Sequence, residues 1–220
     1  EEALKKHPRA KLVAFVHAET STGAASDAAT LARIAHEHDA LVVVDAVTSL
    51  GGSPLEVDAW GLDAVYSGSQ KCLSCTPGLS PVTFSPRAVE AIGQRRTPVQ
   101  SWFLDTSLLE GYFGSNRVYH HTAPISALYG LSEGLEIVAE EGMEKRAARH
   151  RAAAASLLEG VEPLGFEPLV AAPYRLPMLT TLRLPEAVLR SGEAELRRRL
   201  LEHSGIEVGA GLGALAGPVW

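Results

Sequence analysis

Lys71 is the side chain whose setting most suggests chemistry, since it follows the small residues of the run Ser67-Gly68-Ser69-Gln70. A short apolar segment, 64–66, precedes this run, and Pro77-Gly78 turns the chain away after it. Small residues let a ligand approach the backbone closely, which a solvated helix face does not allow. A lysine in a partly dry pocket can lose its proton and form a Schiff base with a carbonyl compound. On this run alone, a plain surface-loop lysine is an equally good interpretation.

An upstream carboxylate supplies a partner for Lys71. The continuous apolar run 41–44 leads into Asp45, a pattern typical of a strand buried on both faces of a parallel sheet. Asp45 is then expected at the carboxyl end of that strand, where open α/β sheets bind their ligands. A strand-end aspartate and a loop lysine suit pyridoxal phosphate, because the lysine can hold the aldehyde while the aspartate keeps the ring nitrogen protonated. The alternative is an aspartate that only caps a turn.

Three more stretches extend this pattern along the chain. They are His17-Ala18-Glu19-Thr20-Ser21-Thr22-Gly23, the segment Val44–Gly52 (VDAVTSLGG) and Tyr119-His120-His121-Thr122. Together with Ser67–Lys71, in this order and at matching spacing, they resemble the class V, fold-type I aminotransferases. The branch they resemble most is that of the alanine–glyoxylate and serine–pyruvate aminotransferases. The resemblance covers nearly the whole chain.

The resemblance implies a role for residues on one wall of a site. Lys71 would form the Schiff base and then carry a proton from the substrate Cα to the cofactor carbonyl carbon. Asp45 would hold the pyridinium nitrogen, and Val47, two residues on, would lie on the same side of the strand and pack on the ring face. Gln70 would reach the cofactor phosphate, and Thr20 would bond the ring hydroxyl. Both polar side chains could instead satisfy loop backbone.

The same resemblance implies a homodimer with shared active sites, since Tyr119 and Thr122 match residues that reach the partner's phosphate group. An exposed loop is the alternative for both. The expected substrates are small amino acids and 2-oxo acids, with an amino group passing from alanine or serine to glyoxylate or pyruvate. Ureidoglycine–glyoxylate transamination is less favoured, because that branch tends to carry Asn where this chain has Tyr119. Cysteine desulfuration needs a mobile cysteine, and Cys72 and Cys75 flank the lysine in an unsuitable place.

The two ends of the sequence lead us to expect that this chain is a fragment of a longer protein. An alternative is that the fragment by itself is folded but catalytically inactive. The chain begins without Met and closes on Trp220 with no polar tail. The resemblance implies that a glycine-rich phosphate loop and a ring-stacking aromatic precede residue 1. It also implies that the arginine binding the substrate carboxylate follows residue 220.

Hydrophobic patterning predicts an α/β fold with a mainly parallel sheet flanked by helices. We expect an incomplete large cofactor-binding domain over 1–140, a connecting helix over 141–160 and an incomplete small α+β domain over 161–220. The predicted strands are 11–16, 41–46, 63–66, 81–84, 182–184 and 206–208. The predicted helices are 26–38, with Leu31, Ile34, Ala35 and His38 on one face, and 86–93, 126–141, 145–158 and 193–202. The segment 100–117 is predicted to be irregular.

Composition narrows the classes of partner. The chain has 220 residues, 46% of them hydrophobic, and a net charge of −6. The acidic balance gives no reason to expect nucleic acid or an anionic membrane as partner, and no apolar stretch approaches the ~18 residues of a membrane span. Two cysteines indicate a reducing compartment, and we expect a cytoplasmic protein. We expect no metal site, because the adjacent or differently facing histidine pairs and the lone Cys72-x-x-Cys75 do not make one.

Overall fold

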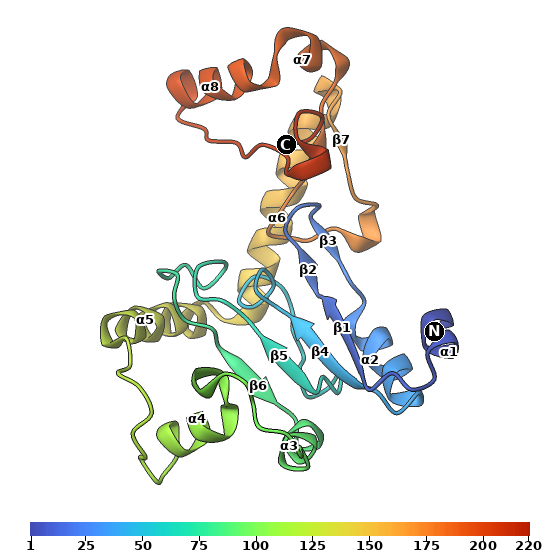
Figure 1. Ribbon diagram of the computed structural model, residues 1–220. Helices are drawn as coiled ribbons and strands as arrows, with labels where there is room; N and C mark the ends of the chain where they lie inside the picture. Colours follow the sequence, from blue (N-terminus) through green and yellow to red (C-terminus); the bar gives the residue numbers. More distant parts are fainter.

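The computed structural model describes all of residues 1–220 and has a four-stranded sheet near its centre (Figure 1). The strand order is β1 (Leu12–Val16), β4 (Leu41–Asp45), β5 (Ala64–Tyr66) and β6 (Val82–Phe84). The first three strands are parallel, and β6 runs antiparallel to β5. All four strands were predicted from the sequence, and the mainly parallel sheet is confirmed.

The register of the sheet aligns the carboxyl ends of three strands. Val16 of β1 pairs with Asp45 of β4, and Asp45 pairs in turn with Tyr66 of β5. The prediction that Asp45 ends a central parallel strand is therefore confirmed. Full burial of β4 on both faces was wrong, since Val42 and Val44 are completely buried while the alternate residues are only half-buried.

Helix α2 (Ala28–Glu37) covers the fully buried face of the sheet. It begins at Asp27, whose side chain accepts a hydrogen bond from the Thr30 N–H at 3.0 Å, as a helix cap requires. The buried side of α2 differs from the predicted face, of which only Ala35 is fully buried. Small side chains let the helix approach the strands closely, and its fully buried residues are all alanines, namely Ala28, Ala32 and Ala35.

The remaining helices are one that precedes the sheet and six that follow its last strand. Two further differences from the sequence prediction stand out. The helices are α1 (Glu2–Lys6), α3 (Pro86–Gly93), α4 (Thr106–Phe113), α5 (Ile125–Glu141), α6 (Met143–Val161), α7 (Glu186–Ser191) and α8 (Glu193–Ser204). The prediction of an irregular 100–117 was wrong, because a short 3-10 turn (Trp102–Leu104) and α4 lie there. Asp105 starts α4 by accepting hydrogen bonds from the Ser107 N–H and hydroxyl at 3.1 and 2.6 Å.

The second difference concerns the C-terminal segment. Short antiparallel pairs join β2 (Ala18–Glu19) to β3 (Ala24–Ala25) and β7 (Glu167–Pro168) to β8 (Leu182–Arg183). A strand over 206–208 was predicted, but this segment forms none. The free edge of β8 is taken by the chain end, because Leu182 and Trp220 exchange backbone hydrogen bonds at 2.8 and 3.0 Å.

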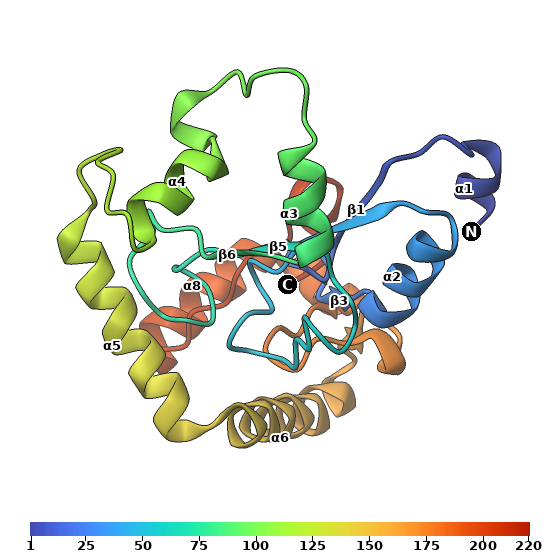
Figure 2. The ribbon, with the colours of Figure 1, turned by 90° about the horizontal axis from the view of Figure 1, so that it is seen from below.

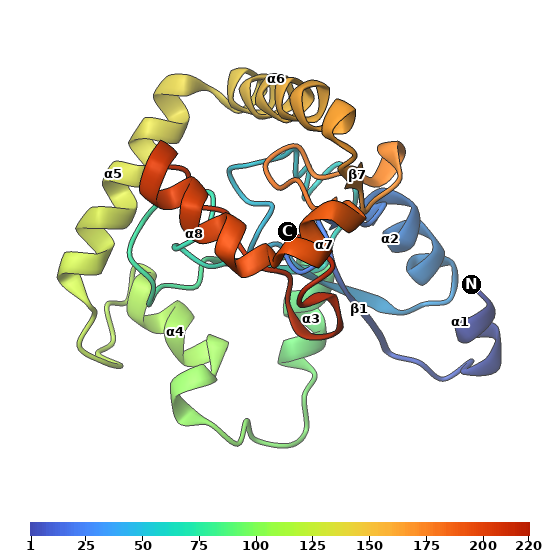
Figure 3. The same cartoon turned by 90° about the horizontal axis from the view of Figure 1, so that it is seen from above.

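Helices α5 and α6 border the sheet-bearing part and meet at an angle (Figures 2 and 3). Gly142 makes the bend between them with a φ of 80°, which favours glycine. From this bend α6 runs to the part that holds β7, α7 and α8 (Figure 1). The chain exposes 13992 Å², whereas a compact monomer of this size is expected to expose about 9,700 Å². None of the helices combines the length and the apolar composition that a membrane-spanning helix needs.

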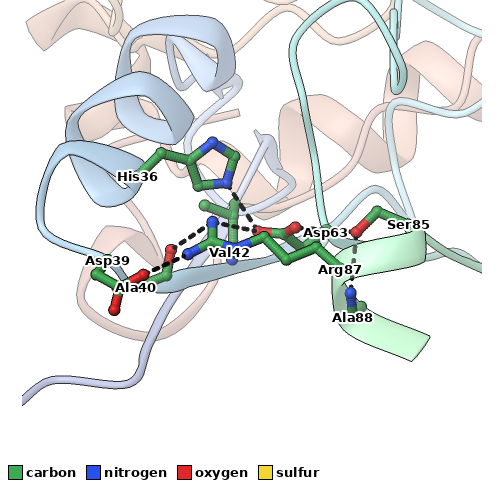
Figure 4. Close-up of polar contacts among 8 residues, drawn as sticks. All are labelled: His36, Asp39, Ala40, Val42, Asp63, Ser85, Arg87 and Ala88. Carbon is green, nitrogen blue, oxygen red and sulfur yellow. Dashed lines mark hydrogen bonds and ion pairs between the residues drawn. The ribbon is translucent and has the colours of Figure 1, made fainter. Parts of the chain in front are cut away.

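A closed polar network lies at the amino end of β5 (Figure 4). Its centre is the carboxylate of Asp63, which is 2% exposed. One oxygen of Asp63 lies 2.8 Å from His36 Nε2 and accepts the Val42 N–H at 2.9 Å, and the other accepts the Ser85 hydroxyl at 2.9 Å. Arg87 Nη1 stands 3.9 Å away. The network joins α2, β4, β5 and α3, and it lies at the opposite end of the strands from Asp45.

Candidate active site

The carboxylate of Asp45 is fixed in orientation where β4 ends. Its Oδ1 accepts the Val47 N–H at 2.8 Å, and its Oδ2 accepts the Tyr66 hydroxyl at 2.9 Å. The bond to Asp45 raises the pKa of Tyr66, so the phenol stays a donor. Val47 is half-buried in the turn after the strand, so strand alternation, on which its predicted direction was based, does not extend to it.

The loop that carries Thr20 is brought against the turn that follows Asp45. The hydroxyls of Thr20 and Thr48 lie 2.5 Å apart, and Thr48 is buried while Thr20 is exposed. Thr181, the residue before β8, also holds this loop, because its hydroxyl donates to the Thr22 carbonyl at 2.5 Å. Gly23 beside it has a φ of 72°, and a Cβ there would stand 3.1 Å from the Leu179 carbonyl oxygen. Thr20 is thus presented at the sheet edge by a loop held on two sides.

Lys71 lies on a turn whose own hydrogen bonds keep it tight. The buried Ser69 hydroxyl donates to the Thr76 carbonyl at 2.6 Å, and the Cys75 N–H donates to the Ser69 carbonyl at 3.0 Å. The Lys71 side chain is exposed, and no hydrogen bond or ion pair engages its ammonium group. Gln70 folds over Gly68, where a Cβ would meet Gln70 Oε1 at 2.6 Å. The turn therefore presents an amine that is free to meet a ligand.

The Asp45 turn (residues 45–53) and the Lys71 turn (residues 67–78) are bonded to each other. The Ser67 hydroxyl donates to the Ala46 carbonyl at 3.0 Å, and Cys72 Sγ lies 3.3 Å from the Thr48 carbonyl. A Cβ on Gly52 would stand only 2.5 Å from Cys72 Sγ, so the two turns are in van der Waals contact. The Lys71 turn also packs against α5, because Cys75 Sγ fills the space that a Cβ on Gly134 would need.

Five of the seven predicted site residues lie together in the structure, and the other two lie on a different segment. Asp45, Val47, Thr20, Gln70 and Lys71 all lie on the two joined turns or on the loop bonded to them. The remaining pair lies on the exposed segment between α4 and α5, where the hydroxyls of Tyr119 and Thr122 are 3.0 Å apart. No hydrogen bond joins this pair to the other five. The ring of Tyr112 lies 6.4 Å from that of Tyr119, and the neighbouring His120 is stacked on Trp102 at 3.9 Å between ring centroids.

Three residues that contact the predicted site residues or their turns were missed in the sequence. Tyr66 was in the apolar segment before the lysine turn, but only the strand register shows that it faces Asp45. Thr48 lies in a stretch that carried the family resemblance, yet nothing in that stretch showed that it holds Thr20. Arg146, which contacts both turns, is far from them in sequence and gave no signal. No group of His, Cys, Asp or Glu side chains is arranged to hold a metal ion.

The chain belongs to the class V aminotransferase family, because the model of that family matches residues 1–217. Its sheet and helices have the fold of fold-type I aminotransferases. The alanine–glyoxylate aminotransferase structure from Nostoc sp. has a TM-score of 0.91 at 49% identity, covering 100% of this chain and 57% of that one.

Two curated relatives are named for different transamination reactions. The alanine–glyoxylate aminotransferase of Callithrix jacchus is 38% identical over 100% of this chain and 53% of its own length. The (S)-ureidoglycine–glyoxylate transaminase of Bacillus subtilis is 35% identical over 98% of this chain and 55% of its own length. The chain thus spans about half the length of the curated relatives that it matches.

Proposed function

We propose that this chain carries the lysine-bearing wall of a pyridoxal phosphate site and that the protein is a transaminase. The preferred reaction moves an amino group from alanine or serine to glyoxylate or pyruvate. The observation that carries the proposal is the direct bonding of the Asp45 turn to the Lys71 turn at the carboxyl ends of β4 and β5. Open α/β sheets bind ligands at this end of their strands.

The donor set of the two turns fits pyridoxal phosphate. Lys71 offers an exposed amine without a partner, which an aldehyde requires. Asp45 offers an oriented carboxylate with spare lone pairs, which a protonated pyridine nitrogen requires. Thr20 offers a hydroxyl at the same edge. When bound, the cofactor supplies an electron-withdrawing ring that stabilises negative charge on the substrate Cα.

The residues of this chain would then divide the work. Asp45, held by the Val47 N–H and the Tyr66 hydroxyl, would keep a proton on the ring nitrogen without needing to reorient. Lys71 Nζ would hold the cofactor and, once released, would carry the proton from the substrate Cα to the former carbonyl carbon of the cofactor. Val47 would pack on the ring face, Gln70 would bind the phosphate, and Thr20 would bond the ring hydroxyl.

A second copy of the chain completes the site in our proposal. Tyr119 is 72% exposed, and its hydroxyl bonds only Thr122. Both hydroxyls are good phosphate ligands, and neither belongs to the joined turns of its own chain. Large apolar side chains are exposed on the segment before this pair, among them Trp102 at 57%, Leu104 at 67% and Phe113 at 63%, and a cluster of this kind is typical of a surface that a further polypeptide segment covers. A reducing cytoplasm suits the two free thiols.

Two alternative reactions are less well supported. Ureidoglycine–glyoxylate transamination has a relative of similar identity in its favour, but Tyr119 stands where that branch tends to carry Asn. Cysteine desulfuration needs a reactive thiolate, whereas burial raises the pKa of the Cys72 thiol, which also donates to the Thr48 carbonyl. Both thiols pack against glycines, so neither is free to swing toward a substrate.

Reductive trapping of the cofactor tests the proposed site. The full-length protein should absorb in the visible, and borohydride should fix the cofactor on the peptide that contains Lys71. Lys71→Ala should abolish turnover, because both the covalent link and the proton carrier are lost. Lys145→Ala is a matched control on an exposed helix position and should keep full activity. Label recovered on Lys11 or Lys145 would contradict the assignment of Lys71.

A donor screen then decides among the reactions. We expect alanine or serine with glyoxylate or pyruvate to give the highest kcat/KM, and ureidoglycine a lower one. Release of sulfide from cysteine would favour the desulfurase alternative. A protein that binds no cofactor and turns over none of these donors would be the inert alternative.

A further inference from the structure

Arg146 is a buried arginine outside the residues assigned so far. It lies near the start of α6, just after the bend at Gly142, and is 8% exposed. An arginine stays charged at all ordinary pH values, so burying one is costly unless every part of its guanidinium group finds a partner. The partners of Arg146 therefore show what it holds.

The guanidinium group of Arg146 donates to three different segments. Its Nε donates to the Gly51 carbonyl at 2.6 Å, and its Nη2 donates to the Cys72 carbonyl at 2.7 Å. Its Nη1 donates to Glu141 Oε2 at 2.7 Å. Gly51 belongs to the Asp45 turn, and Cys72 directly follows Lys71. One rigid, planar group thus spans the two turns that carry the proposed chemistry and joins both to the end of α5.

The backbone around these carbonyls is shaped for this contact. Gly51 has a φ of 82°, a conformation that other residues rarely adopt, and a Cβ there would touch Leu73 at 3.0 Å. Glu141, which bonds both Arg149 and Arg146, completes the arrangement, and these bonds lower its pKa to about 2. Glu141 therefore stays ionised and holds the Nη1 edge of Arg146 while the other edges point at the turns.

We propose that Arg146 is a positioning residue that fixes Lys71 relative to Asp45. This inference rests on the proposed function for its catalytic consequence, since only then does the spacing between Lys71 and Asp45 matter for turnover. Two other links join the turns, from Ser67 and from the thiol of Cys72. Arg146 is the one charged group among the links and the one that anchors both turns to a helix outside the sheet.

Arg146→Lys in the full-length protein tests the proposal, because an ammonium group keeps the charge but lacks the planar fork. We expect kcat to fall ~10- to 100-fold with KM changed much less, since a small displacement of a catalytic group has effects of this size. The pH midpoint of the visible absorbance of the bound cofactor should also shift, because that midpoint reports the setting of the Lys71 nitrogen. In cofactor-free protein, amide hydrogen exchange over residues 71–75 should become faster.

Arg149→Ala is the matched control. Arg149 bonds the same Glu141 but neither turn, and its side chain is 54% exposed. It should leave kcat, the pH midpoint and the exchange of 71–75 unchanged. If Arg146→Lys does not fold, Arg146→Gln replaces it, since an amide can still donate to one of the two carbonyls.

The outcomes separate the inference from the proposed function. A folded Arg146 variant with unchanged kcat and unchanged pH midpoint overturns the positioning role, as does an equal effect in Arg149→Ala. Failure of both Arg146 variants to fold while Arg149→Ala folds assigns Arg146 to global stability and also overturns it. If wild-type Lys71 takes no cofactor, the proposed function fails. The exchange measurement, made without cofactor, then still decides whether Arg146 holds the Lys71 turn.

Discussion

Two aspartates stand at opposite ends of the same pair of parallel strands, and their surroundings differ. Asp63, before β5, is 2% exposed and has donors from α2, β4 and the start of α3 on both oxygens. Asp45, at the end of β4, is half-buried and is held by one backbone N–H and one phenol. The Asp63 network is closed around its charge and stabilises the fold. The Asp45 end is oriented but open, so its charge is available to a ligand.

Asp45→Asn is the substitution expected to have the largest effect on activity. It keeps the shape of the side chain but removes the charge that, in the proposed site, would hold a proton on the ring nitrogen. We expect kcat to fall ~100- to 1000-fold, the range seen when one preorganised charge-stabilising group is lost. Stability and cofactor affinity should change far less, as steady-state kinetics, thermal unfolding and absorbance titration can show. Near-normal turnover in this variant would contradict the proposal that the charge of Asp45 serves the reaction.

Asp63→Asn should show the reverse pattern, with a loss of stability and little change in kcat for the folded protein. It places an amide among donors that need an acceptor, and breaking such a buried charged network typically costs about 3 kcal/mol. Urea unfolding measures the loss. Ser132→Ala, on an exposed position of α5, serves as a control that should leave the urea midpoint unchanged.

The pH dependence of stability sharpens the prediction for Asp63. Burial alone would raise the pKa of Asp63, but hydrogen bonds from His36, the Val42 N–H and Ser85 outweigh it, so the pKa lies below its ordinary value. Folding therefore favours the ionised form, and this stabilisation is complete above the unfolded pKa of ~3.9 and is lost as the pH falls through the lower folded value. The urea midpoint should fall less on acidification in Asp63→Asn than in the wild type. Parallel acid profiles of the two proteins would contradict the assignment.

The sequence predicted the features that depend on neighbouring residues and missed those that depend on residues far away in the chain. The strands, α3 and the place of Asp45 at a strand end come from apolar runs and helix caps within a few residues. Arg146 donates to the carbonyls of Gly51 and Cys72, which are 95 and 74 residues away, and no residue near Arg146 in the sequence predicts these contacts. The segment 206–208 has the composition of a strand, but the chain end occupies the edge of β8. The direction of Val47 failed to follow from alternation because β4 ends two residues earlier. The predicted domain boundaries stay a prediction.

Tyr66→Phe should lower the activity less than Asp45→Asn does. It removes the hydroxyl bonded to Asp45 Oδ2 and leaves the Val47 N–H in place. A hydrogen bond to a charged group contributes about 1.5 kcal/mol or more, so we expect kcat to fall ~10-fold. Tyr129→Phe, on the exposed face of α5, is the matched control and should keep full activity. A Tyr66→Phe enzyme as slow as Asp45→Asn would mean that the phenol acts on the ligand directly.

The contacts of Cys72 and Cys75 with glycines have a consequence for how this protein can change over evolutionary time. Each thiol fills the volume that a Cβ would need at Gly52 or at Gly134, so neither glycine can accept a larger residue while its cysteine remains. At position 52 the obstructing atoms belong to side chains, so positions 52 and 72 should vary together among related sequences. Position 134 should stay glycine even where residue 75 is small, because a Cβ there would also stand 2.9 Å from the Leu73 carbonyl oxygen.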